Sequence, residues 1–284
     1  MRHSGPHGNA LREAIAAAGT TPLIGVHDMY SASLAAAHYD GMFVSGFGFA
    51  GSYYGLPDIG FIAWPDMLAF VERLRWAFPR HHLLVDIDDG YGDPAVACHV
   101  ARRLEALGAS GVILEDQKRP RRCGHVAGKQ ILPLEEYLDK LEQVLACRTD
   151  LVVVARTDAT DEAEILVRAK ALAATDADVV LVDGVRDTDA IRRIRSAIGD
   201  KPLLFNQIAG GRSPRLSLPE LAELGVDVAI YSTPCLFAAH QAMDRALTEL
   251  RAAEGRLPAG DSGDRVGVAE SVELLSRNLR TASR

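Results

Sequence analysis

The sequence lacks several patterns that would each point to a class of protein. Its 284 residues include only four cysteines and no CxxC pair, which argues against a disulfide framework or a zinc site and is typical of a reducing cytoplasm. No run of about 18 apolar residues is present, so no membrane-spanning helix is expected. Basic residues number 31 against 38 acidic ones, which argues against a dominant nucleic-acid role. We therefore expect a cytoplasmic protein with neither a membrane nor a nucleic acid as partner.

What the sequence does contain is a regular succession of short apolar runs. Each run is rich in β-branched residues or leucine and does not alternate with polar residues, as expected of strands buried on both faces. We predict strands at Pro22–Val26, Met42–Ser45, Leu83–Ile87, Gly111–Glu115, Leu151–Arg156, Asp178–Val182, Pro202–Asn206 and Asp227–Tyr231. Amphipathic helices are predicted between them at Asp93–Leu107, Leu134–Cys147, Asp161–Ala174, Thr188–Ile198 and Leu218–Leu224.

Eight strand–helix units in succession predict a parallel sheet, and eight is the number of strands that closes a barrel. The expected fold is therefore α/β, a (β/α)8 TIM barrel, with residues 1–252 as the catalytic domain. Residues 253–284 are expected to form a C-terminal extension, helical or partly flexible, with a short helix at Val266–Leu279 that docks loosely or on a neighbouring subunit. An open doubly wound sheet is the alternative, disfavoured because no GxGxxG follows the first strand and no Walker A motif occurs.

Acidic residues gather where predicted strands end, which is the end of a barrel that carries the active site. Asp86 and Asp88 alternate at the end of the third strand, so their side chains are expected to leave the same face, and Glu115 ends the next strand. Three converging carboxylates repel one another unless a cation lies between them, and hard oxygen ligands suit Mg²⁺, with Mn²⁺ as the alternative. The competing interpretation is that acidic residues only cap the following helices, as we expect of Asp89 and Asp93.

Arg156 ends the fifth predicted strand. A buried guanidinium at a barrel mouth needs an anion, and a substrate carboxylate is its natural bidentate partner. An internal salt bridge to Asp158 or Glu115 is the alternative, and the two interpretations can both hold.

The basic segment Gln117–Ile131 connects the fourth strand to its helix. We expect it to close as a lid over a polyanionic substrate, because closure brings positive charge to the ligand and excludes water. Cys123 lies in this segment between arginines and His125, so we expect a lowered thiol pKa and a role in proton transfer.

These residues are part of a longer, ordered set of motifs. The set comprises Ser45-Gly46-Phe47, Gly55-Leu56-Pro57-Asp58-Ile59-Gly60, Asp86-Ile87-Asp88-Asp89-Gly90-Tyr91-Gly92, Glu115-Asp116-Gln117, Arg121-Arg122-Cys123-Gly124-His125, Ala155-Arg156-Thr157-Asp158-Ala159 and Asn206 with Gly210-Gly211-Arg212-Ser213-Pro214. From about Leu23 to Leu250 the chain thus resembles the isocitrate lyase/phosphoenolpyruvate mutase superfamily, and its Cys-Gly-His motif resembles the 2-methylisocitrate lyase branch. The resemblance implies a Mg²⁺-dependent barrel that assembles as a homotetramer, with the terminal helix exchanged between subunits.

The resemblance also assigns roles to individual residues. It implies a metal shell of Asp58, Asp86, Asp88 and Glu115, and catalytic roles for Cys123, Arg156 and Glu115, with Cys123 donating a proton to the departing enolate. It implies substrate binding by Ser45, Gly46, Phe47, Arg122, Gly124, His125, Arg156, Asp183, Asn206, Arg212 and Ser213. Two positions depart from the usual pattern, because Arg121 stands where lysine is usual and Asp183 where glutamate is usual.

The expected activity is that of a Mg²⁺-dependent carbon–carbon lyase with a small-molecule carboxylate as substrate. A 2-hydroxy di- or tricarboxylate, similar to 2-methylisocitrate, would be cleaved by retro-Claisen or retro-aldol chemistry to an oxo-acid (pyruvate or glyoxylate) and a dicarboxylate. The alternatives within the superfamily are a carboxyphosphonoenolpyruvate or phosphoenolpyruvate phosphonomutase and an oxo-acid hydrolase or decarboxylase. A non-catalytic paralogue that binds an oxo-acid is a further alternative.

Overall fold

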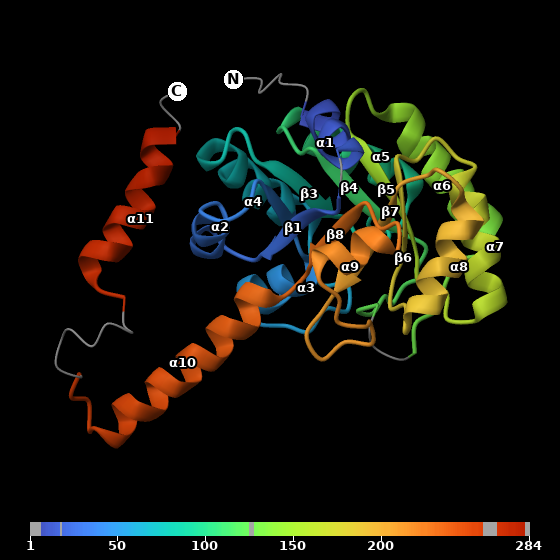
Figure 1. The fold of residues 1–284 in the computed structure, drawn as a ribbon. Helices are drawn as coiled ribbons and strands as arrows, with labels where there is room; N and C mark the ends of the chain where they lie inside the picture. Colours follow the sequence, from blue (N-terminus) through green and yellow to red (C-terminus); the bar gives the residue numbers. More distant parts are fainter. Residues whose placement is uncertain (1–6, 18, 125–127, 258–265, 282–284) are drawn as a thin grey trace.

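The centre of the molecule is a closed barrel of parallel strands. A computed structural model describes residues 7–17, 19–124, 128–257 and 266–281 of the chain. The strands follow one another around the barrel in chain order, and the last pairs with the first (Figure 1). They are β1 Thr21–Val26, β2 Gly41–Val44, β3 His82–Asp86, β4 Gly111–Glu115, β5 Val152–Thr157, β6 Val179–Val182, β7 Leu203–Gln207 and β8 Val228–Tyr231. The predicted TIM barrel is confirmed, with each strand within one residue of its predicted bounds.

The strands are buried on both faces, which explains why their sequences do not alternate with polar residues. Every residue of β2, β4, β5 and β6 is buried. One apolar cluster takes alternate residues of the strands, such as Phe43, Leu84 and Ile113, and also includes Leu11 and Ile15 of α1 (His7–Ala16). Helix α1 therefore closes the amino-terminal end of the barrel and leaves the carboxyl ends of the strands for a site.

Helices surround the barrel and connect its strands. After α1 they are α2 Met29–Ala35, α3 Gly46–Phe49, the π-helical turn η1 Ala50–Tyr54, α4 Trp64–Ala77, α5 Pro94–Ala106, α6 Leu134–Cys147, α7 Glu162–Ala173, α8 Thr188–Ile198, α9 Leu218–Glu223, α10 Pro234–Ala252 and α11 Val268–Thr281. The sequence predicted α5 to α9 within one residue and α11 within two. Asp93 and Asp161 cap α5 and α7, accepting hydrogen bonds from the N–H groups of Ala95 and Glu164 at 2.7 and 3.0 Å.

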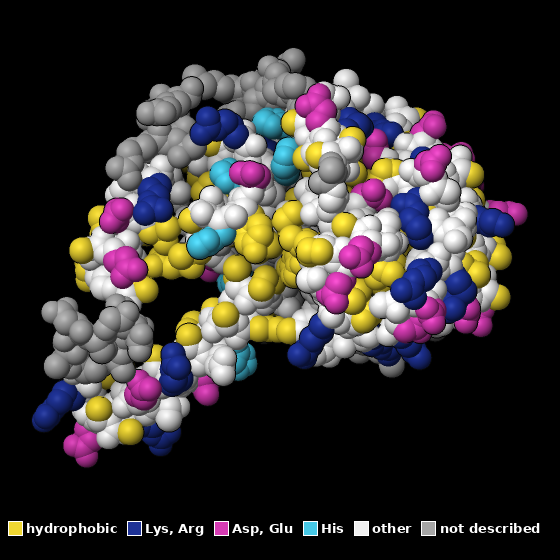
Figure 2. All heavy atoms as spheres, in the orientation of Figure 1, with side chains coloured by type: hydrophobic (Ala, Val, Ile, Leu, Met, Phe, Trp, Pro, Cys, Tyr) yellow, Lys and Arg dark blue, Asp and Glu magenta, His cyan; other side chains and the backbone are white. Residues whose placement is uncertain are grey.

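The last two helices lie outside the ring. Helix α10 runs away from the barrel, and α11 lies beside α2 and α4 (Figure 1). The Tyr30 hydroxyl is hydrogen-bonded to Ser271 Oγ at 3.2 Å, and the Asn278 amide donates to Ser33 Oγ at 2.9 Å. Figure 2 shows apolar side chains along α10 and between α11 and the barrel. Among the residues that the structure describes, no helix is long and apolar enough to span a membrane.

Candidate active site

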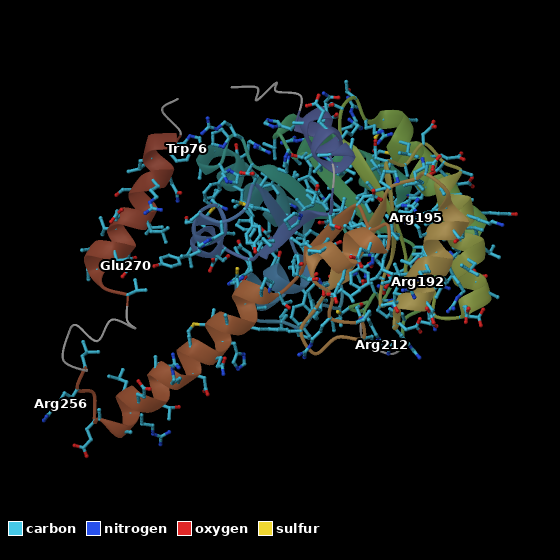
Figure 3. The ribbon with its side chains drawn as sticks, viewed as in Figure 1. Trp76, Arg192, Arg195, Arg212, Arg256 and Glu270 are labelled. Carbon is cyan, nitrogen blue, oxygen red and sulfur yellow. The ribbon has the colours of Figure 1, made fainter. Side chains whose placement is uncertain are left out.

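The carboxyl ends of the strands form the open end of the barrel, because α1 covers the other. Arg212 lies at this end, on the loop between β7 and α9, at the lower edge of the barrel in Figure 3. Arg192 lies below Arg195 in the same view, so α8 also begins at this end. The loops that follow the strands, and the starts of the helices, therefore surround the candidate site.

Asp86 and Asp88 lie together at the end of β3, but the reason predicted from the sequence is wrong. Strand pairing ends at Asp86, and Asp88 lies in a turn with a φ of +53°, so the two residues do not alternate along one strand. The Asp88 N–H donates to Asp86 Oδ1 at 3.1 Å, the bond of an Asx turn, in which an aspartate side chain accepts from the backbone two residues further on. A Cβ on Gly46 would lie 3.2 Å from an oxygen of each carboxylate, so the two acids share one small space.

Arg121 reaches into this group of acids from the segment after β4. Its Nε donates to Glu115 Oε1 at 2.8 Å, its Nη1 is paired with Asp58, and Nη1 also lies 3.4 Å from Asp88 Oδ1. Only 1% of the Arg121 side chain is exposed. Burial raises the pKa of Asp88 well above its ordinary value and that of Glu115 to about 8, although the Arg121 charge opposes both shifts. We call Asp58, Asp86, Asp88 and Glu115 the carboxylate cluster.

The carboxylate cluster fits a hard divalent cation by its chemistry. Both side-chain oxygens of Asp88 and Oε2 of Glu115 are buried, with no hydrogen-bond partner in the described part of the chain. Buried polar atoms almost always have a partner, and carboxylate oxygens are the ligands that Mg²⁺ and Mn²⁺ prefer. Yet no three of the described acids, histidines or cysteines already surround one point as metal ligands do. In this structure the cluster is centred on Arg121.

Arg156 is held by acids from three neighbouring segments. Its guanidinium donates to Asp158 Oδ2 through Nε at 2.9 Å and to Asp183 Oδ2 through Nη2 at 2.7 Å. Glu115 Oε2 lies 3.3 Å from the same Nη2. The internal salt bridge considered for Arg156 is thus confirmed, and binding of a substrate carboxylate by Arg156 stays a prediction.

Hydrogen bonds extend this group across β7 to β8. The Asn206 amide donates to Asp183 Oδ1 at 2.9 Å, and the Ser232 hydroxyl donates to Asn206 Oδ1 at 2.7 Å. All three side chains are buried. Asp183 therefore connects Arg156 with Asn206 on the other side of the barrel mouth. The orientation of the Asn206 amide is set by its bonds to Asp183 and Ser232.

The segment between β4 and α6 folds back on itself. Gln117 and Ile131 form an antiparallel bridge at its base. The Gln117 side chain then holds the Arg122 backbone, because its Nε2 donates to the Arg122 carbonyl at 2.7 Å and its Oε1 accepts the Arg122 N–H at 2.8 Å. These contacts direct the chain toward the barrel mouth, where Gly124 lies against Asp183 and Arg156. We call the segment Gln117–Ile131 the lid, and its closure over a substrate stays a prediction.

Gly124 packs directly against the acid–arginine pair of the barrel mouth. A Cβ on Gly124 would lie 1.8 Å from Asp183 Oδ2 and 2.5 Å from Arg156 Nη2. Lys129 holds the lid in this place, because its buried Nζ donates to the Gly124 carbonyl at 2.6 Å and to Asp158 Oδ1 at 2.8 Å. Glycine is therefore required at residue 124 when the lid lies as it does here.

Replacing Gly124 with alanine is expected to lower kcat/KM by about 100-fold, since displacing a catalytic group by about 1 Å costs that much. The unfolding temperature should stay close to that of the wild type because the lid can withdraw. Gly51→Ala is the matched control, because a Cβ there meets only Leu236 Cδ2, at an ordinary 3.8 Å. Steady-state kinetics with wild-type values for Gly124→Ala would contradict the tight fit described for this lid.

Ser45, Gly46 and Phe47 lie where β2 ends and α3 begins. Ser45 is buried and caps α3, its Oγ accepting the Gly48 N–H at 3.3 Å. Phe47 packs edge-on against Phe237 at the start of α10, with ring centroids 6.0 Å apart. Their predicted substrate contacts stay predictions, although Gly46 does lie against the carboxylate cluster.

The other predicted site residues that the structure describes lie on loops and differ in how far they are buried. Cys123 is half-buried in the lid, whereas the Arg122 residue is exposed. Arg212 lines a cavity of about 200 Å³ between the lid, β6 and α8. Ser213 Oγ is buried without a hydrogen bond to any described residue. His125 lies outside the described residues.

Asp116 supports the site from beneath. Its carboxylate accepts hydrogen bonds from Thr157 Oγ1 at 2.6 Å, from the Asp158 N–H at 2.9 Å and from Arg168 Nη1 at 2.9 Å. Burial, together with the Asp158 charge, raises the pKa of Asp116 to about 6. Asp158 was predicted as a partner of Arg156, but its bond with Lys129 was not predicted, because no spacing pattern connects positions 29 residues apart.

A parallel eight-stranded barrel with buried acids, a fixed arginine and a cysteine-bearing lid at its carboxyl end defines a class of barrel enzymes. The family described as phosphoenolpyruvate phosphomutase matches residues 11–251. The chain therefore belongs to the phosphoenolpyruvate mutase/isocitrate lyase superfamily of enzymes, as the motifs predicted.

Named relatives are similar over most of the chain. A 2-methylisocitrate lyase from Shewanella oneidensis is 32% identical over 241 residues, which cover 83% of this chain and 82% of that protein. A 2,3-dimethylmalate lyase from Eubacterium barkeri is 30% identical over 249 residues, 85% of each chain. The structure of an oxaloacetate acetylhydrolase with 3,3-difluorooxalacetate superposes with a TM-score of 0.90 at 27% identity, covering 99% of this chain and 96% of that one.

Proposed function

We propose that this enzyme is a divalent-metal-dependent carbon–carbon lyase acting on a 2-hydroxy di- or tricarboxylate similar to 2-methylisocitrate. Its products are an oxo-acid, pyruvate or glyoxylate, and a dicarboxylate. The observation that carries the proposal is the position of the lid, which holds Gly124 against Asp183 and Arg156 and so brings Cys123 to the barrel mouth. The two relatives at 30 and 32% identity, both named as lyases, support this reaction class.

Different residues of the site have different roles in a retro-aldol cleavage. Mg²⁺ or Mn²⁺, when held by the carboxylate cluster, supplies a Lewis acid that lowers the pKa of the substrate hydroxyl and stabilises the new carbonyl. Arg156 binds a substrate carboxylate, and its bonds to Asp158 and Asp183 keep the guanidinium plane in place.

Bond cleavage leaves an electron pair on carbon, which must receive a proton. The 2-hydroxyl gives its proton to Glu115, whose Oε2 accepts no hydrogen bond from the described residues. The hydroxyl oxygen becomes a carbonyl oxygen, and the electrons of the broken carbon–carbon bond go to the departing enolate. Cys123 Sγ delivers a proton to that carbon. The closed lid excludes water, which protects the carbanion-like intermediate from premature quenching.

An oxo-acid hydrolase is the second candidate, favoured by the TM-score of 0.90 to an oxaloacetate acetylhydrolase over 99% of this chain. The hydrate of an oxo-acid carries a hydroxyl beside a carboxylate, so it offers the carboxylate cluster and Arg156 the same groups as a 2-hydroxy acid. The two activities therefore differ in substrate more than in the residues they need.

A substrate panel separates these reactions. Purified enzyme is assayed with 2-methylisocitrate, 2,3-dimethylmalate, oxaloacetate and phosphonopyruvate, with Mg²⁺ or with a chelator, by release or consumption of an oxo-acid and by phosphorus-31 spectra. We expect metal-dependent oxo-acid release from a 2-hydroxy acid. Cleavage of oxaloacetate alone would favour the hydrolase, and rearrangement of the phosphorus compound would favour the phosphonomutase. Turnover unaffected by the chelator would contradict the metal requirement.

We also propose that the enzyme assembles as a homotetramer through its C-terminal helices. Nothing in the described chain buries any residue of α10, and Met243 and Leu247 on it are 57% and 66% exposed. A mostly apolar cavity of about 680 Å³ lies between α2 and the start of α10. Apolar surface of this extent is typical of a subunit interface. Sedimentation velocity is expected to give four times the chain mass, and a monomer at micromolar concentration would contradict the proposal.

A further inference from the structure

Arg121 occupies the place in the carboxylate cluster where a metal cation would be expected. Its guanidinium bonds to Glu115 Oε1 and Asp58 and lies 3.4 Å from Asp88 Oδ1. These contacts come from three separate segments, so Arg121 holds together acids that would otherwise repel one another. The cluster is therefore partly neutralised without any metal.

Arg121 and Arg156, whose Nη2 lies 3.3 Å from Glu115 Oε2, leave this neutralisation incomplete. Asp88 keeps both side-chain oxygens, and Glu115 keeps Oε2, without a hydrogen bond from the residues described. A divalent ion that took up these oxygens would lie beside the guanidinium and be repelled by it. The divalent ion and Arg121 would therefore compete for the same carboxylates, those of Asp88 and Glu115.

The arginine at this position is suited to act as a fixed counter-charge. A guanidinium is planar, stays charged at all physiological pH values and binds two acceptors from a rigid fork, whereas an ammonium is a compact point charge that loses its proton more readily. Gly60, with a φ of +88°, makes room for the arginine stem, because a Cβ there would lie 3.2 Å from Arg121 Cγ. The loop that carries Asp58 thus fits the side chain of Arg121.

We propose that Arg121 is an internal counter-cation of the carboxylate cluster, which competes with the divalent ion for Asp58, Asp88 and Glu115 and thereby sets the metal affinity of the enzyme. The inference rests on the proposed function, since it requires that the cluster bind a divalent ion. Arg121 lies two residues before Cys123 in the lid. The position of the lid is therefore expected to influence metal binding as well.

The test is the affinity of the metal-free full-length enzyme for Mn²⁺, measured by calorimetric titration. Arg121→Gln removes the competing charge and is expected to bind Mn²⁺ at least about tenfold more tightly than the wild type, given the strength of charge interactions at about 4 Å in a buried site. Arg121→Lys keeps a charge but cannot bridge Asp58 and Glu115, so its affinity should fall between the two. The matched control is Arg119→Gln, because Arg119 pairs with Asp89 at 2.8 Å but is 41% exposed, and its affinity should stay within about twofold of the wild type.

Thermal unfolding supplies an independent readout. Metal-free Arg121→Gln should unfold at a lower temperature than the wild type, since Asp58 and Glu115 lose a buried partner. Saturating Mn²⁺ should raise the unfolding temperature of this variant more than that of the wild type. If Arg121→Gln does not fold without metal, the Mn²⁺ affinity of Arg121→Lys decides the question.

The outcomes distinguish the two proposals. Wild-type binding of Mn²⁺ with equal or weaker binding by the Arg121 variants would overturn the counter-cation and leave the metal site intact. Absence of Mn²⁺ binding in the wild type and in every variant would overturn both the metal site and the role of Arg121.

Discussion

Replacing Asp88 with asparagine is expected to lower turnover by on the order of 10³-fold or more while leaving the metal-free fold at least as stable as the wild type. Asp88 contributes to the carboxylate cluster two buried oxygens that accept no hydrogen bond within the described structure, so its loss removes the best available metal ligand. Asparagine has the same shape and tolerates the left-handed φ of +53°. Metal-dependent binding of an oxo-acid should be lost together with turnover.

The stability of this variant follows from the direction of the pKa shift. Burial raises the pKa of Asp88 in the folded protein well above its value in the unfolded chain. The stabilising contribution of the protonated acid is therefore complete below about pH 4 and is lost as the pH rises toward the folded-state pKa. Asparagine cannot ionise, so the unfolding temperature of the variant should exceed that of the metal-free wild type increasingly above about pH 4.

Asp93→Asn is the matched control for Asp88→Asn. Asp93 lies in the same connection but only caps α5, and asparagine caps a helix equally well. Kinetics, calorimetry of oxo-acid binding with Mn²⁺ and thermal unfolding from pH 4 to 8 provide the comparison. Normal metal-dependent oxo-acid binding by Asp88→Asn would exclude Asp88 from the metal site.

Replacing Cys123 with serine is expected to reduce lyase turnover by roughly 10²–10⁴-fold, the usual contribution of a general acid, while substrate binding survives. Serine keeps the shape of cysteine but has a hydroxyl of much higher pKa, so it donates a proton poorly. The rate at which solvent deuterium exchanges into the α-carbon of the second product, the carbon that receives the proton, should fall in parallel. The phosphonomutase reaction needs no proton at carbon, so Cys123→Ser would lower its rate only modestly, through a small disturbance of the lid.

Cys98→Ser provides the control, because Cys98 is also half-buried but lies on α5, outside the lid. A Cys123→Ser enzyme with near-normal lyase turnover would remove the cysteine from the mechanism. If turnover falls but solvent deuterium exchanges into the α-carbon of the second product at the wild-type rate, another group supplies the proton.

Local patterns predicted the strands and helices α5 to α9. The predicted bounds of β4, α6 and α8 are those of the structure, because β4 is an uninterrupted apolar run that is buried throughout and the buried residues of α6 and α8 recur with the period of a helix. Helix α4 was not predicted, since it begins after Ala63, which cannot cap a helix by its side chain. Helix α10 was not predicted either. None of its residues is buried in the described structure, so its sequence does not need a regular apolar repeat that would reveal the helix.

Predictions for the site were reliable where a residue ends a strand. Glu115 and Arg156 are direct partners in the β4–β5 register, so their proximity follows from the parallel order of the strands alone. The position of Asp86 at the carboxyl end of β3 was predicted correctly for the same reason. Asp88 was placed correctly by an incorrect argument, because the strand ends at Asp86, two residues before Asp88, and a turn brings the two carboxylates together.

The sequence by itself determined which side chains stand at the carboxyl ends of the strands, because strand and helix periods depend on near neighbours along the chain. Only the tertiary structure decided how the loops meet. Arg121 and Asp58 are 63 positions apart, and Lys129 and Asp158 are 29 apart. Whether Arg121 lies in solvent or in the carboxylate cluster depends on the lid folding back over the barrel and on the space left by Gly60. That arrangement forms when distant loops pack, and no periodicity in the sequence encodes it.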